Sequence, residues 1–242
     1  MANLTSVAVV PGQELYSSKA TASHRLGERV TDGHGREFVY VKNGAVAMLP
    51  GKVYQAPAEV TDHDQLTPVA AAIGDKTVTV ALGATAATEG QYAGGLLCVD
   101  TTPAPGHSYV IAGHPAAALS TSVVITLEHP IVHTALTTSS RITLAPNPWN
   151  GVIVSPATTL TGAVVGVAVY PLAASEYGWL QVSGHCCTLI GGTPAVGACV
   201  VVPGDTAGEV VVDPANAATQ VVGSMMVTGV DGKYMPVLLN IV

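Results

Sequence analysis

The stretch Lys76-Thr77-Val78-Thr79-Val80-Ala81-Leu82 sets threonine and valine in alternation. In an extended chain successive side chains point to opposite faces, so the valines share one face and the threonines share the other. This alternation is typical of a strand that is buried on one side only. The stretch therefore predicts a half-buried β-strand.

Short runs of similar character continue to the end of the chain. The 26 glycines and 16 prolines fall between them and leave too little room for helices of the usual length, about 11 to 12 residues. Only helical turns at 69–73 and 115–119 fit the alanine-rich pieces. We expect an all-β fold, with short antiparallel strands in a sandwich or barrel-like body, an extended N-terminal arm and little helix. The expected strands are 95–99, 108–112, 123–127, 141–144, 152–154, 163–169, 177–183, 186–190, 198–202, 209–212, 220–226 and 234–240.

The first quarter of the chain has a different character. Residues 11–43 are polar and irregular, which predicts an extended arm. Two β-prone runs, 36–41 and 45–54, flank Asn43-Gly44, a dipeptide that suits a tight hairpin turn. We therefore divide the chain into an arm with a small β-hairpin region at 1–59, a linker at 60–68 and a β-rich body at 69–242, with room for two sub-domains.

The composition is poor in charge. Charged residues make up 10% of the chain, against about 25% in an average globular protein, and the mean hydropathy is +0.44. Large exposed apolar patches are rare on true monomers. We therefore expect copies of this chain or another protein to cover part of its surface.

The charge and the apolar segments also bear on other partners. A net charge of -7 argues against nucleic acid, which usually requires a basic face. The longest apolar segment, 151–173, is interrupted by Pro156 and Pro171, so no membrane-spanning helix is expected. The N-terminus lacks the basic region of a secretory signal, which predicts a protein that stays where it is made.

The basic residues are unevenly distributed. All but Arg141 and Lys233 lie at or before Lys76. An irregular arm that carries these cations is a candidate docking element. Its candidate contact residues are Lys19, Arg25, Arg29, Arg36 and Lys42.

Motifs for catalysis or metal binding are weak. His129 and His133 have the i, i+4 spacing of helical metal ligands, but Pro130 and two β-branched residues favour an extended chain, so polar loop histidines are expected. Asp62-His63-Asp64 is better explained as a solvated linker than as a cation site. His185 and Cys186 are neighbours in a strand and should point to opposite faces, which disfavours a base and nucleophile pair.

The remaining residues of chemical interest have structural interpretations. The four cysteines fit neither a metal motif nor a disulfide framework, and buried free thiols are expected. Trp149 and Trp179 are expected in the core or at an interface. The sequence contains no nucleophile elbow, phosphate loop or dinucleotide-binding motif. We therefore expect no catalytic residue, no metal and no cofactor, and a protein that is not an enzyme.

Several phrases of the last two thirds consist of turns and strands rather than active-site motifs. The phrases are Gln91-Tyr92-Ala93-Gly94-Gly95, Gly113-His114-Pro115, Ile125-Thr126-Leu127-Glu128-His129-Pro130, Pro146-Asn147-Pro148-Trp149-Asn150-Gly151-Val152 and Glu176-Tyr177-Gly178-Trp179-Leu180-Gln181. Together they resemble a known class of proteins, the capsid cement or decoration proteins of tailed bacteriophages.

The resemblance implies a β-rich virion protein on the outer surface of the phage head, made in the host cytoplasm and often trimeric. It would bind the major capsid protein and strengthen the shell. Two alternatives remain: a head fibre or tail-associated host-attachment protein, which the 5% aromatic content disfavours, and a hydrolase of cell-surface polysaccharide. For the hydrolase, the residues to test are Glu128, Glu176 and His185.

Overall fold

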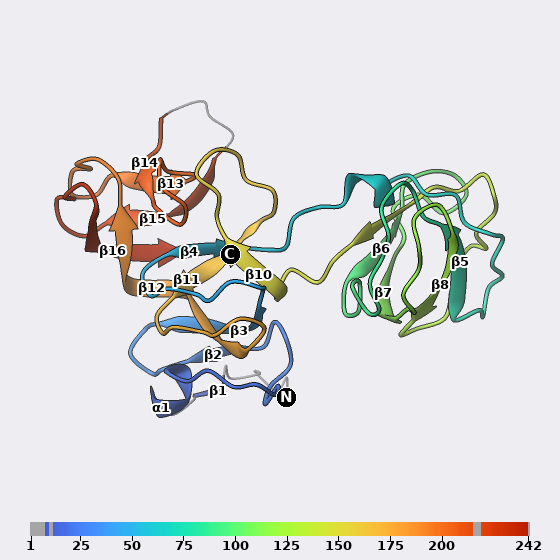
Figure 1. The fold of residues 1–242 in the computed structure, drawn as a ribbon, viewed down its shortest axis with the longest axis horizontal. Helices are drawn as coiled ribbons and strands as arrows, with labels where there is room; N and C mark the ends of the chain where they lie inside the picture. Colours follow the sequence, from blue (N-terminus) through green and yellow to red (C-terminus); the bar gives the residue numbers. More distant parts are fainter. Residues whose placement is uncertain (1–7, 10–11, 215–218, 242) are drawn as a thin grey trace, which may run out of the picture. The chain divides into compact units, whose positions relative to one another are not determined.

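The computed structural model describes residues 8–9, 12–214 and 219–241, and these form two compact units (Figure 1). The main unit consists of the chain up to Ala58 and from Pro148 onward. The inserted unit is Glu59–Asn147, drawn from cyan to yellow-green in Figure 1. The chain therefore leaves the main unit once and returns to it once.

An 11-stranded sheet builds the main unit. The spatial order is β1 (Ala8–Val9), β2 (Arg29–Thr31), β3 (Glu37–Asn43), β10 (Asn150–Val154), β4 (Val53–Gln55), β11 (Val164–Ala168), β12 (Tyr177–Ile190), β16 (Lys233–Asn240), β15 (Gln220–Met225), β13 (Cys199–Val202) and β14 (Val211–Val212). A further pairing of β3 with β12 closes β3, β10, β4, β11 and β12 into a ring.

Strand β3 is buried on both faces. Val39 and Val41 belong to the large core cluster of the main unit, whereas Phe38 and Tyr40 on the opposite face pack with Trp179 in a second cluster. Leu15 of the short helix α1 (Gly12–Leu15) and Val30 of β2 complete this second cluster. The segment before β3 therefore covers the second face of that strand.

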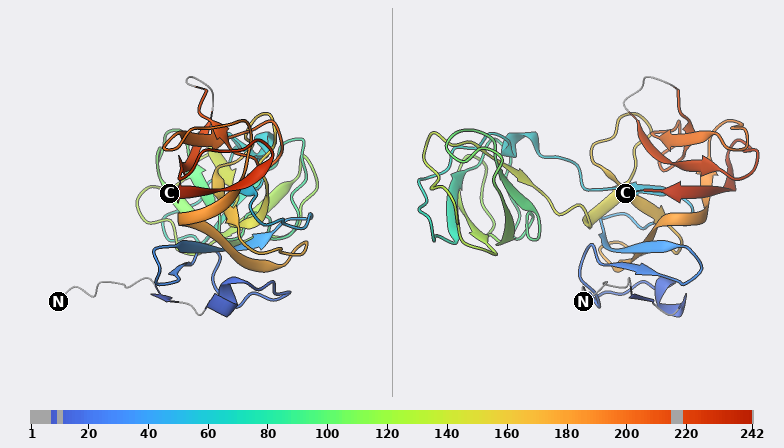
Figure 2. Two further views of the ribbon diagram at one scale, coloured as in Figure 1. Left: turned by 90° about the vertical axis from the view of Figure 1, so that its left-hand side faces the viewer. Right: turned by 180° about the vertical axis from the view of Figure 1, so that it is seen from behind.

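A five-stranded antiparallel sheet builds the inserted unit, and Figure 2 shows it curled around its interior. Its order is β5 (Thr77–Ala81), β8 (Ser122–Leu127), β7 (Ser108–Gly113), β6 (Leu96–Val99) and β9 (Ile142–Ala145). The two edge strands are joined by the segment 66–69: Leu66 pairs with Ile142 of β9, and Pro68 pairs with Val80 of β5. The inserted unit thus has a closed sheet around its own apolar core.

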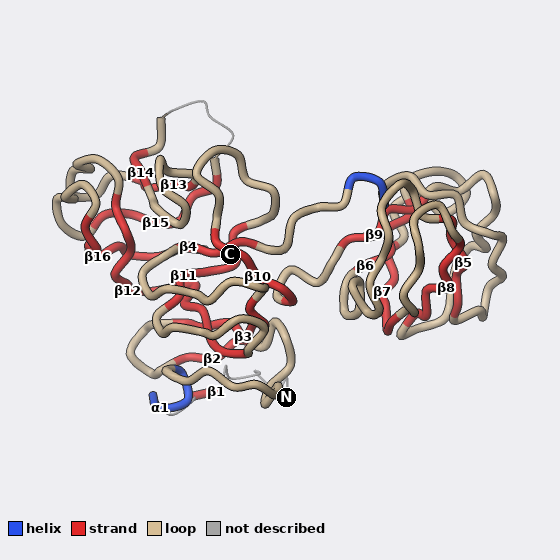
Figure 3. The backbone as a smooth tube through the Cα atoms, viewed as in Figure 1, coloured by secondary structure: helices blue, strands red, loops and turns tan. Residues whose placement is uncertain are grey.

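The all-β prediction is confirmed. In Figure 3 strands and loops dominate, and the described residues contain only two short helical segments, α1 and the 3₁₀ turn η1 (Thr61–His63). Thr77–Ala81 is a strand with Val78 and Val80 buried, as the alternation of the opening stretch predicts. The runs expected to make helical turns, 69–73 and 115–119, lie outside helices.

The expected domain boundaries differ from the division that the structure shows. Strand β3, placed in the separate region 1–59, pairs with β10 and β12 of the predicted body. Leu66, placed in the linker 60–68, hydrogen bonds with Ile142 in both directions. Both differences arise because these pairings join residues far apart in sequence, which local patterns do not encode.

Two local expectations are also wrong. The hairpin around Asn43-Gly44 does not form, because β10 lies between β3 and β4 in the sheet. From residue 12 onward the expected arm packs against the main sheet, with Leu15 and Val30 fully buried. These two apolar residues hold the polar segment to the body; residues 1–7 and 10–11 lie outside the described structure.

Candidate functional site

An open groove of ≈ 710 Å³ lies in the surface of the main unit. Strands β12 and β16 contribute residues to it side by side, since Cys187 pairs with Pro236 and Leu189 with Tyr234. The turn before β4 contributes Leu49, Pro50 and Gly51. The volume lies within the range of about 300 to 1,000 Å³ that is common for binding sites.

Gly51 fits the tight approach of this turn to Tyr234. Its φ is +77°, a left-handed conformation that glycine adopts readily, and a Cβ at this position would collide with the Tyr234 ring. The Gly51 carbonyl accepts a hydrogen bond of 2.8 Å from the Leu189 amide. Glycine therefore allows the turn and the tyrosine ring to form one continuous wall.

The groove has little net charge. Arg36 is the only Lys, Arg, Asp or Glu among its described lining residues, and its Nε donates to Asp32 Oδ2 at 2.6 Å. Burial alone would raise the pKa of Asp32, but hydrogen bonds from the His34 amide and from Arg36 outweigh it, and the pKa is lowered. The pair is therefore ionised and self-neutralising at neutral pH.

Gln181 is a buried polar residue in the lining. Its Nε2 donates to the carbonyl oxygens of Ser183 and His185, each at 2.9 Å, which fixes the orientation of the amide. Its Oε1 is buried and has no hydrogen-bond partner within the described part of the chain. An unsatisfied buried acceptor costs about 1 to 3 kcal/mol.

An apolar turn, residues 45–50, lies at the rim of the groove. Val46 is 75% exposed and Leu49 54% exposed, whereas Met48 is fully buried and anchors the turn. The Leu49 amide donates to the Tyr54 hydroxyl at 2.7 Å, and Asn43 Nδ2 donates to the Val46 carbonyl at 2.9 Å. These bonds hold apolar side chains in a fixed, exposed position.

Sequence patterns did not reveal this surface. The groove combines residues from the beginning, the middle and the end of the chain, which no local pattern connects. The only local signal was the uncharged run Ala45-Val46-Ala47-Met48-Leu49-Pro50, which was expected to be a strand.

Three of the five predicted contact cations have partners within the chain. Lys19 Nζ lies 3.4 Å from Glu14 Oε1, Arg36 pairs with Asp32, and Lys42 Nζ lies 5.6 Å from the centre of the Tyr177 ring. The first two contacts lie within the covering segment, and the third joins the neighbouring strands β3 and β12.

The other two, Arg25 and Arg29, are exposed. Neither forms a salt bridge with any residue that the structure describes. These two guanidinium groups remain available to a partner.

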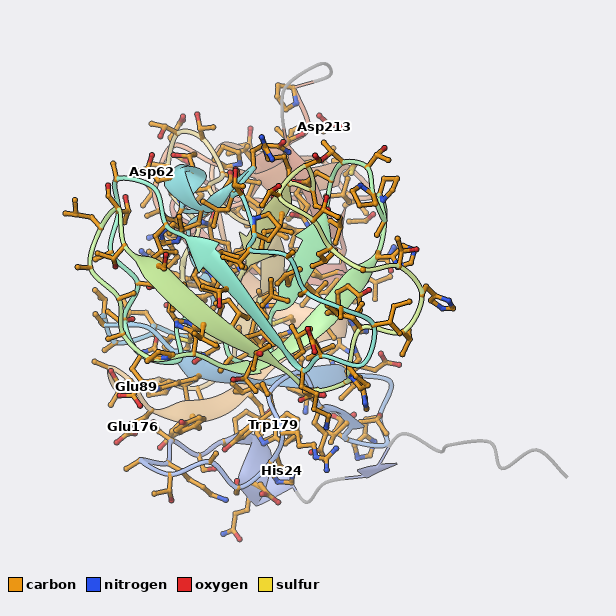
Figure 4. All side chains as sticks on the ribbon, turned by 90° about the vertical axis from the view of Figure 1, so that its right-hand side faces the viewer. His24, Asp62, Glu89, Glu176, Trp179 and Asp213 are labelled. Carbon is orange, nitrogen blue, oxygen red and sulfur yellow. The ribbon has the colours of Figure 1, made fainter. Side chains whose placement is uncertain are left out.

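His24 joins the covering segment to the aromatic cluster. Its Nε2 lies 2.8 Å from Glu14 Oε1 and its Nδ1 lies 3.3 Å from Glu28 Oε1, and its ring contacts Tyr40 and Trp179. His24 and Trp179 are labelled in Figure 4. The hydrogen bond to Glu14 raises the pKa of His24, against the effect of burial, and lowers the pKa of Glu14. Trp179 is in the core, as expected.

The histidines considered for chemistry are dispersed. His63, expected in a solvated linker, is fully buried, with Nδ1 beside the Tyr92 hydroxyl and Nε2 2.9 Å from the Thr85 carbonyl. His129 and His133 are exposed, and the His133 ring contacts His107. Within the described ranges, no three His, Cys, Asp or Glu side chains are grouped as metal ligands would be.

The cysteines divide by exposure. Cys186 is buried, and burial raises the pKa of its thiol to about 12. The expectation of buried thiols is wrong for Cys187 and Cys199, which are exposed, and Cys98 is half-buried. Cys187 lies in the groove, whereas Cys199 does not line it.

Comparisons with known proteins identify no relative: no family model, no curated protein and no solved structure matches the chain. The helices of the described residues are all too short to cross a lipid bilayer.

Proposed function

We propose that this chain is a structural protein of a virus particle, a capsid cement or decoration protein of a tailed bacteriophage. It acts on the outer surface of the head by binding the major capsid protein and copies of itself. The observation that carries the proposal is the exposed, nearly charge-free apolar surface of the main unit, formed by the groove and the apolar turn. The resemblance of the sequence phrases to cement and decoration proteins is the reason for proposing a phage capsid as the assembly.

The surface chemistry supports a role in assembly. Tyr234 and Met226 are 51% and 47% exposed beside Leu49, in a chain with a net charge of -7. Exposed apolar groups that lie together mark protein interfaces more often than isolated ones do. On a lattice, many modest contacts of this kind add up through repetition.

Arg25 and Arg29 supply a second, polar contact. Both are exposed beside or within β2 and lack an ion-pair partner among the described residues. We assign them to acidic or backbone groups of the major capsid protein. Lys19, Arg36 and Lys42 have partners within the chain, so we do not assign them to this contact.

The experiment uses purified heads of the phage that encodes the chain, stripped of this protein. We expect the chain to sediment with these heads at saturation in hundreds of copies, and the double variant Arg25→Glu/Arg29→Glu to lose most of this binding. Lys233→Glu makes the same kind of charge change at an exposed site on β16 and should bind normally. Failure of the wild-type chain to sediment with heads contradicts the proposal.

A further inference from the structure

We propose that the groove receives the apolar turn, residues 45–50, of a second copy of this chain. The inference rests on the proposed assembly role and names the surface through which copies meet. It has three physical grounds: the shape of the two features, their lack of charge and the chemistry at the base of the groove.

The first ground is shape. The turn exposes Val46 and Leu49 on a backbone fixed by hydrogen bonds, and the groove beside it is concave and lined by Tyr234 and Met226. A rigid turn loses little conformational freedom when it is bound. Leu49 and Pro50 also form part of the rim of the groove, whereas Val46, the most exposed side chain of the turn, does not line it. Each copy therefore carries an apolar turn beside an apolar hollow, so it can donate one turn and receive one.

This arrangement is compatible with more than one closed symmetry. A contact in which each copy donates one element and receives one closes in a twofold pair and equally in a three-membered ring. The turn and the groove therefore permit the trimer that the sequence resemblance implies. Either assembly forms by repeating this one type of contact, without a second kind of interface.

The second ground is charge. Copies of a chain with a net charge of -7 repel each other, and like charges on the faces that meet would add to this repulsion. Residues 45–50 contain no charged side chain, and Arg36 of the groove is neutralised by Asp32. An uncharged turn fits this groove better than a charged partner segment does.

The third ground is Gln181. Its fully buried amide oxygen lacks a donor within the described residues, although the residue belongs to the groove lining. The exposed turn contains backbone N–H groups, among them those of Ala45 and Ala47. A small opening of the groove that admits a turn would let one of these N–H groups satisfy the oxygen.

Two variants test the two halves of the contact separately. Val46→Lys charges the turn and leaves the groove unchanged, whereas Met226→Lys charges the groove and leaves the turn unchanged. Val196→Lys is the matched control, because Val196 is 63% exposed on the main unit and does not line the groove. All three are read by sedimentation equilibrium of the full chain.

We expect the wild type and Val196→Lys to associate, and each of the other two variants to weaken association more than about tenfold, since each buries a charge in an apolar contact. A monomeric wild type, or association unchanged in either variant, overturns the inference.

Thiol labelling gives an independent measurement. Brief maleimide treatment of the wild type, with peptide mapping by mass spectrometry, should modify Cys199 and spare Cys187 while the oligomer is intact. In Val46→Lys both should react. Equal labelling of Cys187 in the two proteins contradicts the inference.

Binding to heads is measured separately, which distinguishes the two proposals. A chain that self-associates through the groove but does not sediment with heads refutes only the capsid role. If the chain coats heads but the Val46→Lys and Met226→Lys variants associate as tightly as the wild type, only the groove contact is refuted.

Discussion

At the scale of single residues, Gly51 makes a testable contribution to the groove. We expect Gly51→Ala to destabilise the main unit by about 2 kcal/mol. The alanine would be held in a left-handed backbone conformation, and its Cβ would collide with the Tyr234 ring. Urea unfolding followed by tryptophan fluorescence measures this, since Trp149 and Trp179 both belong to the main unit.

The matched control for this substitution is Gly33→Ala. Gly33 has a nearly identical φ of +78°, but a Cβ added there would meet no other atom within 4 Å. It should therefore show only the backbone strain, about 1 kcal/mol. Equal destabilisation by the two substitutions would show that Tyr234 does not close against the turn.

The Glu14–His24 pair predicts a pH-dependent stability. His24 has a raised pKa, so its contribution is full below its ordinary value of 6.5 and is lost as the pH rises through the raised value. Glu14 has a lowered pKa, so its contribution is full above 4.5 and is lost as the pH falls through the lowered value. The pair therefore stabilises the main unit most between pH 4.5 and 6.5.

The substitution Glu14→Gln tests this window. We expect it to reduce the free energy of unfolding by on the order of 1 kcal/mol near pH 5.5 and by progressively less above pH 6.5. Tryptophan-monitored urea unfolding over a pH series measures the difference. Glu37→Gln is the control, since Glu37 forms no salt bridge with the residues described; a difference that stays constant with pH would exclude the pair as its cause.

At the scale of elements, strand positions followed from local patterns and strand partners did not. The alternation in Thr77–Ala81 identifies a strand and its buried face, because one face meets the core and the other meets water. Strand β3 shows the limit of this reasoning. Its run of four buried residues has no alternation, because a covering segment buries its second face.

The segment 66–69 also shows that local sequence patterns do not reveal pairing partners. It lies across the predicted boundary between the linker 60–68 and the body 69–242, yet its backbone joins β5 and β9 through pairings with Val80 and Ile142. Backbone hydrogen bonds of this kind depend little on side-chain identity, so composition does not reveal them. The groove was missed for a related reason, since its walls meet only after distant strands have paired.

The five candidate contact cations remain a prediction. Charge alone could not separate Arg25 and Arg29, which are exposed and form no salt bridge with the described residues, from Lys19, Arg36 and Lys42, which have partners in the chain. That distinction depends on acidic and aromatic partners whose positions are set by the fold.

At the scale of the whole molecule, the insertion of one unit into another predicts that the inserted unit folds alone. It has its own apolar core, and the sheet is closed by residues 66–69 within its own boundaries. A fragment of residues 59–147 should therefore give dispersed amide resonances and a cooperative thermal transition. Replacing the same residues by a short Gly-Ser linker should leave the tryptophan fluorescence of the main unit native.

A shorter fragment, residues 70–147, is the control that tests the closing segment. It begins after Leu66 and Pro68 and also lacks the buried His63, so it exposes the free edges of β5 and β9 and part of the core. We expect it to be unfolded or to aggregate. If both fragments fold with the same thermal midpoint, the closing segment contributes nothing to stability; if neither folds, the inserted unit depends on the main unit despite its separate core.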